Sequence, residues 1–143
     1  GCAEGECGAC SILVARPGDP DAPDDRTRWT AINACLTPAA ALADQEVITS
    51  EGLGGPDDLH PVQAAMALRG GSQCGYCTPG QICSAVGMLD EVAKGWPSHV
   101  TDDLSAPALD DAEISERMSG NICRCGAYSN IADAMADVAG EKA

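Results

Sequence analysis

The chain has 143 residues, of which 45% are hydrophobic and only 3% aromatic, with no phenylalanine. A chain of this length holds one or two small domains, whose cores must be built from aliphatic side chains and methionine. The formal charge of −14 argues against nucleic acid and anionic membranes as partners. No apolar run approaches the roughly 18 residues that a membrane-spanning helix needs.

The first half of the chain has the pattern of strands joined by loops. Residues 11–15 form a short apolar strand candidate, and residues 28–33 alternate as a return strand would. The segment 16–28 is rich in Pro, Asp and Gly and predicts a hydrated hairpin loop. Residues 46–49 are a third strand candidate. The composition of residues 50–59 predicts a linker, and the domain boundary is placed there.

The second half of the chain predicts four helices. Pro61 suits the first turn of a helix that reaches about residue 69 and ends at Gly70 and the glycine after it. A second helix is expected to begin with Thr78 as its N-cap and Gln81 completing a capping box. Gly95 follows the end of this helix.

Two further helices follow along the chain. Asp110 and Glu113 predict the start of a third helix that ends near Gly120, and Ser129 is expected to cap a fourth. His60 precedes Pro61 at a helix start and is interpreted as a cap or surface residue rather than a metal ligand.

The first of two cysteine sets has the spacing C-x4-C-x2-C followed by one distant cysteine: Cys2, Cys7, Cys10 and Cys35. This is the spacing of plant-type [2Fe–2S] ferredoxins. Gly5 and Gly8 lie among these residues, where they permit close wrapping of the loop and allow N–H groups to approach sulfur. A zinc tetrathiolate is the alternative, but zinc sites usually use two C-x2–4-C pairs.

The second set combines C-x2-C with C-x-C: Cys74, Cys77, Cys123 and Cys125. Each pair directly precedes a predicted helix start, so two helix N-termini with free N–H groups would converge on the thiolates. This arrangement favours iron–sulfur, although the spacing alone leaves zinc open. The odd number of cysteines and their tight pairs argue against a disulfide framework.

Two residues near these sets need separate interpretation. Cys83 lies six residues past Cys77 on the second helix and is expected to be a buried apolar residue rather than a ligand. Arg124 either screens the charge of a cluster or forms a salt bridge at a partner surface.

The chain carries no dinucleotide fingerprint, phosphate-binding loop or nucleophile motif, so no catalytic residue is expected. These features predict an electron carrier that depends on other proteins at both ends.

Four segments resemble the small iron–sulfur subunits of molybdenum hydroxylases, the xanthine oxidase and aldehyde oxidoreductase family: CAEGECGAC at 2–10, NACL at 33–36, QCGYCTPGQ at 73–81 and GNICRCGAY at 120–128. The resemblance covers almost the whole chain and is closest to the bacterial, often periplasmic, aldehyde oxidoreductases. It implies an α+β fold with a β-grasp plant-type ferredoxin domain at 1–50, a linker at 51–59 and a four-helix [2Fe–2S] domain at 60–143. The family's first strands precede its first cysteine, so the β-grasp domain is expected to be incomplete here, with a further N-terminal segment that carries any export signal.

The resemblance also implies a role for each cysteine set. Cys2, Cys7, Cys10 and Cys35 would hold an outer cluster that faces a flavin. The second set, Cys74, Cys77, Cys123 and Cys125, would hold an inner cluster that faces molybdopterin. Gln73 and Cys125 would contact the pterin itself.

The implied assembly is a heterotrimer. Molybdopterin would belong to a large subunit and FAD to a medium subunit, and electrons from aldehyde oxidation to carboxylic acid would pass through both [2Fe–2S] clusters to FAD or an external acceptor. The expected compartment is the periplasm, with the cytoplasm as the alternative. Two other functions remain open: a free-standing two-cluster ferredoxin-like carrier and a structural zinc module.

Overall fold

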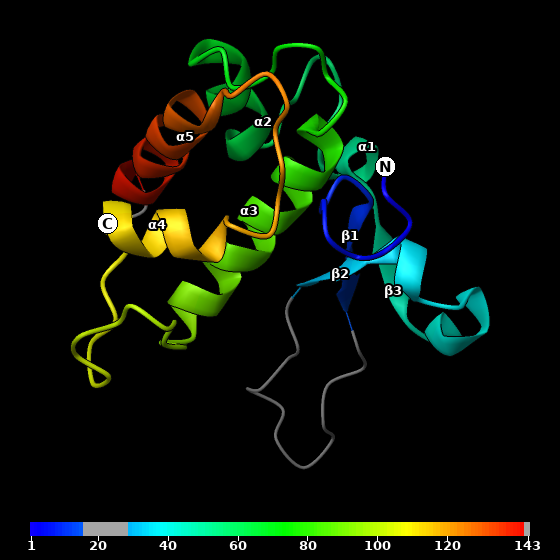
Figure 1. Ribbon diagram of the computed structural model, residues 1–143, viewed down its shortest axis with the longest axis horizontal. Coiled ribbons are helices and arrows are strands. Elements are labelled where there is room, and N and C mark those ends of the chain that lie inside the picture. Colours follow the sequence, from blue (N-terminus) through cyan, green and yellow to red (C-terminus); the bar gives the residue numbers. More distant parts are fainter. Residues whose placement is uncertain (16–28, 142–143) are drawn as a thin grey trace.

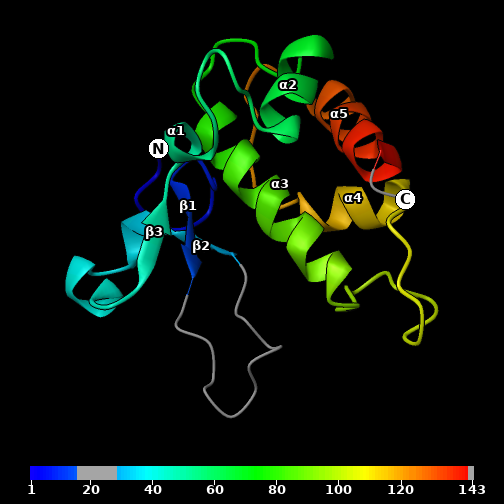
Figure 2. The same ribbon diagram turned by 180° about the vertical axis from the view of Figure 1, so that it is seen from behind.

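The computed structural model describes residues 1–15 and 29–141 (Figure 1). A small sheet and a group of helices lie on opposite sides of the long helix α3 (Thr78–Ala93), as the views from the front and from behind agree (Figures 1 and 2). The hairpin loop expected at 16–28 lies outside the described residues. None of the described helices is long and apolar enough to cross a membrane.

The sheet has three antiparallel strands in the order β2-β1-β3. β1 (Ser11–Ala15) is the central strand and contributes the fully buried Leu13, which pairs with Ala31 of β2 and Ile48 of β3. β2 (Thr30–Asn33) begins after Trp29, and β3 (Glu46–Ile48) ends one residue earlier than expected. The three predicted strands are therefore confirmed, and β1 and β2 both contact α3.

The segment expected to be a linker begins with a helix. α1 (Ser50–Leu53) is a single turn, and only the residues after it lack regular structure until α2. The side-chain amide of Gln63 donates to the carbonyl oxygens of Ser50 at 2.9 Å and Gly54 at 3.4 Å. These bonds hold the connecting segment against α2. The Gly, Pro and Asp pattern of the segment does not reveal this contact.

α2 (Pro61–Leu68) has the expected proline in its first turn. His60 is its N-cap: the imidazole Nδ1 accepts from Val62 N–H at 3.2 Å, and the His60 N–H donates to Gln63 Oε1 at 2.8 Å. The interpretation of His60 as a capping residue is therefore confirmed.

The start of α3 differs in detail from the prediction. Its N-cap is Cys77 rather than Thr78, and no side chain closes the cap. Gln81 is buried, and its amide donates to the carbonyl oxygen of Asn121 at 3.1 Å instead of completing a capping box. The predicted box at Thr78 and Gln81 is therefore wrong, because a tertiary contact recruits the glutamine.

The remaining two helices lie where the sequence predicts them, but the predicted cap at Ser129 is wrong. Asp110 caps α4 (Asp111–Arg117) by accepting from Ala112 and Glu113 N–H, both at 3.0 Å. α5 (Tyr128–Glu141) begins one residue before Ser129, whose hydroxyl contacts Asn130 instead of capping the helix.

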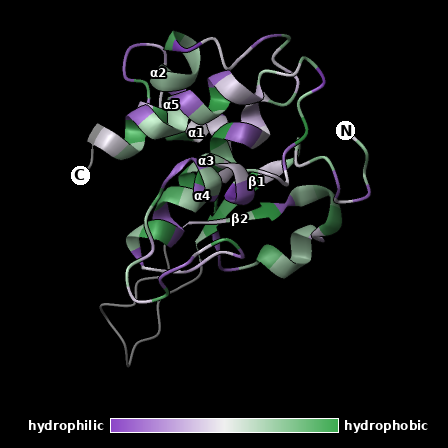
Figure 3. Cartoon of the chain, turned by 60° about the vertical axis from the view of Figure 1, so that its left-hand side comes forward, coloured by the Kyte–Doolittle hydropathy of each residue, from purple (hydrophilic) through white to green (hydrophobic). Residues whose placement is uncertain are grey.

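A contiguous core joins the sheet to the helices through α3. In Figure 3 the bands along α2 and α5 alternate between hydrophilic and hydrophobic, as expected for helices that bury one face. The core is aliphatic and sulfur-containing, as the composition requires. Its largest fully buried apolar side chains are Leu13, Val62, Met66, Cys83, Ile114, Met135 and Val138.

Candidate metal centres

The first cysteine set is assembled by a loop that folds back onto the end of β2. The Asn33 side-chain amide donates to Gly5 O at 3.0 Å, and Ala34 N–H donates to Cys10 O at 3.3 Å. These bonds bring Cys35 beside the loop. Gly5 has a φ of +79°, and a Cβ there would lie 2.3 Å from Leu36 Cδ1, so the loop requires a glycine at this position.

The thiols of this set interact in two pairs. Glu4 N–H donates to Cys2 Sγ at 3.4 Å, and this amide, further loop amides and the Cys7 thiol lower the pKa of Cys2 to about 6. The amide of Cys35 is the main cause of a lowered pKa at Cys10, whereas the Cys10 thiol raises the pKa of Cys35. Hydrogen bonds to sulfur favour the thiolate, which is the form that binds metals.

The second set lies where two helices begin. Cys77 directly precedes α3, and Cys123 and Cys125 lie just before α5. Burial, followed by the Cys123 thiol, raises the pKa of Cys77 to about 11. Burial also opposes ionisation of Cys123, but the Ala127 amide at the start of α5 and the Cys77 thiol lower its pKa overall. The lowered pKa of Cys123 is in the direction expected for a thiol at a helix N-terminus.

A tyrosine supports this second loop, which the sequence did not predict. The Tyr128 hydroxyl oxygen accepts from Cys123 N–H at 2.8 Å. Cys74 and Cys125 are exposed, whereas Cys77 and Cys123 are buried. Gln73 is also exposed, and its amide donates to Gly70 O at 2.8 Å.

The two sets are neighbours in space, although more than 60 residues of sequence separate most of their members. They border one cavity of about 520 Å³, which is lined by Gly1, Cys2, Cys7, Ala9, Cys74, Tyr76, Cys77, Ile122 and Arg124. Ile122 N–H donates to Cys7 O at 2.9 Å, so the two cysteine loops are joined directly by a backbone hydrogen bond.

Close backbone packing holds the loops in this arrangement. Asn121 donates to Gly8 O at 3.1 Å and accepts from the buried Gln81 at 3.1 Å, which links the first loop to α3 through a single asparagine. A Cβ on Gly8 would lie 2.5 Å from the carbonyl oxygen of Gly120. A Cβ on Gly80 would lie 2.1 Å from Gly8 O. Neither glycine can be replaced without moving backbone.

The donor chemistry fits two clusters with thiolate ligands. Each set supplies four cysteines, loop amides reach their sulfurs, and the Cys2–Cys7 and Cys10–Cys35 pairs match two thiolates for each of two irons. Within residues 1–15 and 29–141, no three His, Cys, Asp or Glu side chains meet around a single metal-ion position. Cys83 is fully buried on α3, and burial raises its pKa to about 11, which confirms it as a core residue.

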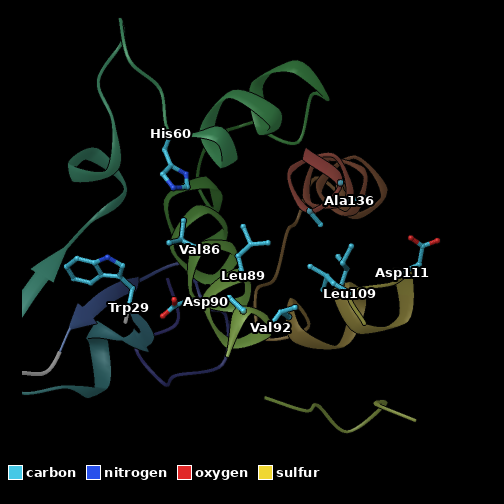
Figure 4. Close-up of a pocket in the computed structure, with 13 residues that line it drawn as sticks. Trp29, His60, Val86, Leu89, Asp90, Val92, Leu109, Asp111 and Ala136 are labelled. Atoms are coloured by element: carbon cyan, nitrogen blue, oxygen red, sulfur yellow. The ribbon is translucent and has the colours of Figure 1, made fainter. Parts of the chain in front are cut away.

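A larger cavity of about 680 Å³ lies away from the cysteines (Figure 4). Aliphatic side chains of α3, α4 and α5 form most of its wall, with Trp29, His60 and two carboxylates at its edges. Its described lining contains no cysteine, so it is separate from the candidate metal centres.

Comparison with known proteins assigns this arrangement to a class. The family described as "[2Fe-2S] binding domain" matches residues 49–136, which is more than half of the chain. The chain therefore belongs to this family of iron–sulfur proteins.

Particular relatives make the similarity more specific. The chain is 54% identical to the aldehyde oxidoreductase iron-sulfur-binding subunit PaoA of Escherichia coli K12, over 99% of this chain and 56% of that protein. It is 41% identical to a xanthine dehydrogenase of Calliphora vicina, over 92% of this chain and 8% of that protein. The solved structure of the aldehyde oxidoreductase from Desulfovibrio gigas superposes with a TM-score of 0.67 at 36% identity, covering 98% of this chain and 13% of that one. The chain thus spans little more than half of PaoA and a small part of the larger enzymes.

Proposed function

We propose that this chain is the electron-transfer subunit of a molybdenum hydroxylase of the aldehyde oxidoreductase type. The outer [2Fe–2S] cluster is held by Cys2, Cys7, Cys10 and Cys35. The inner [2Fe–2S] cluster is held by Cys74, Cys77, Cys123 and Cys125. The observation that carries the proposal is the single cavity that both sets border, together with the hydrogen bond from Ile122 N–H to Cys7 O.

When bound, each cluster supplies a one-electron redox couple. The chain's own residues determine where the two clusters would lie. Loop amides donate to the thiolates of the first set, and Asn121 docks that loop against α3. Burial of Cys77 and Cys123 keeps water from part of the second set. The hydrogen bond at Ile122 connects a residue of one set to the neighbour of Cys123, which gives a short path of bonds between the two sets.

The proposed assembly places this subunit between two partners. The exposed Gln73 and Cys125 face the molybdopterin of a large subunit, and the outer cluster faces FAD on a medium subunit or an external acceptor. Aldehydes are the proposed substrates, because PaoA and the D. gigas enzyme carry that activity in their names. We also propose a β-grasp domain at 1–50, a four-helix domain at 60–143 and a periplasmic location.

Metal analysis with visible and EPR spectroscopy tests the proposal. The purified natural chain should contain about four irons and four acid-labile sulfides, and reduction should produce two distinct EPR signals. A colourless protein that contains zinc would end the iron–sulfur proposal. The alternative of a free-standing carrier predicts that no molybdopterin protein co-purifies, so a large subunit recovered in near-equal amount argues against it.

A further inference from the structure

Arg124 is the one lysine or arginine in the described part of the chain whose side chain has no carboxylate partner. The other three described lysine and arginine side chains are ion-paired: Arg69 with Asp137 at 2.6 Å, Lys94 with Asp90 at 3.2 Å, and Arg117 with Glu91 and Glu113 at 3.1 and 2.9 Å. In a chain with a formal charge of −14, acidic side chains are abundant. Arg124 pairs with none of the described carboxylates, so none of them compensates its positive charge.

The position of Arg124 identifies what that charge acts on. Its side chain is exposed and lines the cavity of about 520 Å³ that both cysteine sets border. Cysteines of the first set and of the second set share this lining. Arg124 also lies between Cys123 and Cys125 in the sequence, so its backbone belongs to the loop of the second set. No other lysine or arginine lines the described part of this cavity.

A positive charge at this place has a definite electrostatic effect. Reduction of a [2Fe–2S] cluster adds one electron and therefore one unit of negative charge to a site that is already anionic. A nearby cation stabilises the reduced form more than the oxidised form, so it raises the reduction potential. The guanidinium of Arg124 supplies such a positive charge.

We propose that Arg124 raises the reduction potential of the second cluster, and that of the first cluster to a smaller extent. This inference rests on the proposed electron-transfer function. Arg124 acts as a tuning residue that holds neither an iron nor a substrate. Its charge makes the second cluster a better acceptor for an electron that arrives from outside the chain.

The experiment compares the natural chain with its clusters in place against Arg124→Gln and Arg124→Lys, by EPR-monitored redox titration with dithionite as reductant. Lys94→Gln is the matched control, because it removes the same charge at the far end of α3. That helix has 16 residues and is therefore about 24 Å long. At a fixed ambient potential, Arg124→Gln should lower the reduced-to-oxidised ratio of the second cluster about threefold, equivalent to about 30 mV for one electron. Arg124→Lys should restore most of the ratio, and Lys94→Gln should change it much less.

Two further readouts separate this inference from its competitors. The difference between the natural chain and Arg124→Gln should shrink as salt is added, because the exposed charge is screened over about 8 Å at physiological ionic strength. Unchanged potentials in Arg124→Gln overturn the inference. Unchanged potentials with weakened binding of the partner subunits also overturn it and identify Arg124 as a partner contact. If Arg124→Gln does not retain its clusters, Arg124→Met provides the same neutral comparison. A natural chain without iron–sulfur signals would instead overturn the proposed function itself.

Discussion

Replacing Gly8 with alanine tests whether the two cysteine loops are locked together by close backbone contact. Gly8 has a φ of +65°, and a Cβ there would lie 2.5 Å from Gly120 O and 2.6 Å from Asn121 Nδ2. The left-handed conformation alone costs a non-glycine residue roughly 1–2 kcal/mol. Overpacking against backbone adds about 1–3 kcal/mol. We therefore expect Gly8→Ala to destabilise the holo-protein by about 2–5 kcal/mol.

Gly95→Ala is the matched control for this substitution. Gly95 also has a positive φ, of +71°, but a Cβ there would meet nothing within 4 Å. The control should therefore show only the conformational cost of about 1–2 kcal/mol. The difference between the two variants isolates the close approach of the loops.

Thermal unfolding measured by far-UV circular dichroism, together with loss of visible cluster absorption, provides the assay. For a chain of 143 residues, a further 1–3 kcal/mol corresponds to a midpoint about 2–12 °C lower than that of the control. Gly8→Ala should also lose cluster absorption before the helices unfold, because the strain falls on the cysteine loops. Equal midpoints for the two variants would show that the loops separate without cost and would refute the argument for a rigid junction.

Three more substitutions test other parts of the structure. Cys125→Ser should abolish the EPR signal of the second cluster and leave that of the first, and loss of both signals or of neither contradicts the division into two sets. Glu113 accepts from the Thr101 hydroxyl and from Arg117, and these contacts lower its pKa. Its ionised form therefore contributes stability above the unfolded-state pKa of about 4.3, which is lost as the pH falls through the lower folded-state value. The urea midpoint should accordingly drop more between pH 5 and pH 3 in the natural chain than in Glu113→Gln. An equal drop in both proteins would count against a stabilising role for ionised Glu113. Tyr128→Phe removes the acceptor of Cys123 N–H and should cost about 1 kcal/mol in urea unfolding, with a spectral change confined to the second cluster.

The helices and strands were largely predictable because their signals are local. Proline at the start of α2, Asp110 before α4 and the alternation of β2 each depend on neighbouring residues. The start of α3 was predicted wrongly in its cap, since Gln81 has a buried partner 40 residues away that its local sequence does not reveal. α1 was missed for a similar reason, because hydrogen bonds from Gln63 hold that segment.

The candidate site was predictable in composition but not in arrangement. Cysteine spacing predicts the two sets, and burial of Cys83 was expected from its place on the helix. The shared cavity, the Tyr128 contact and the lack of a described carboxylate partner for Arg124 depend on how loops far apart in sequence pack together. Spacing rules contain no information about such contacts, so the sequence alone leaves two interpretations of Arg124 open.

Hydrogen bonds around the start of α3 hold the loops of the two cysteine sets together. The proposed electron transfer between two clusters requires a fixed separation between the two cysteine sets. Here the buried Gln81 on α3 holds Asn121, and Asn121 holds the first loop at Gly8. The glycine at position 80 lets that loop pack directly against the helix. α3 therefore contacts the first loop and begins next to Cys77 of the second set, so that a substitution at Gln81 should change how the two sets pack together.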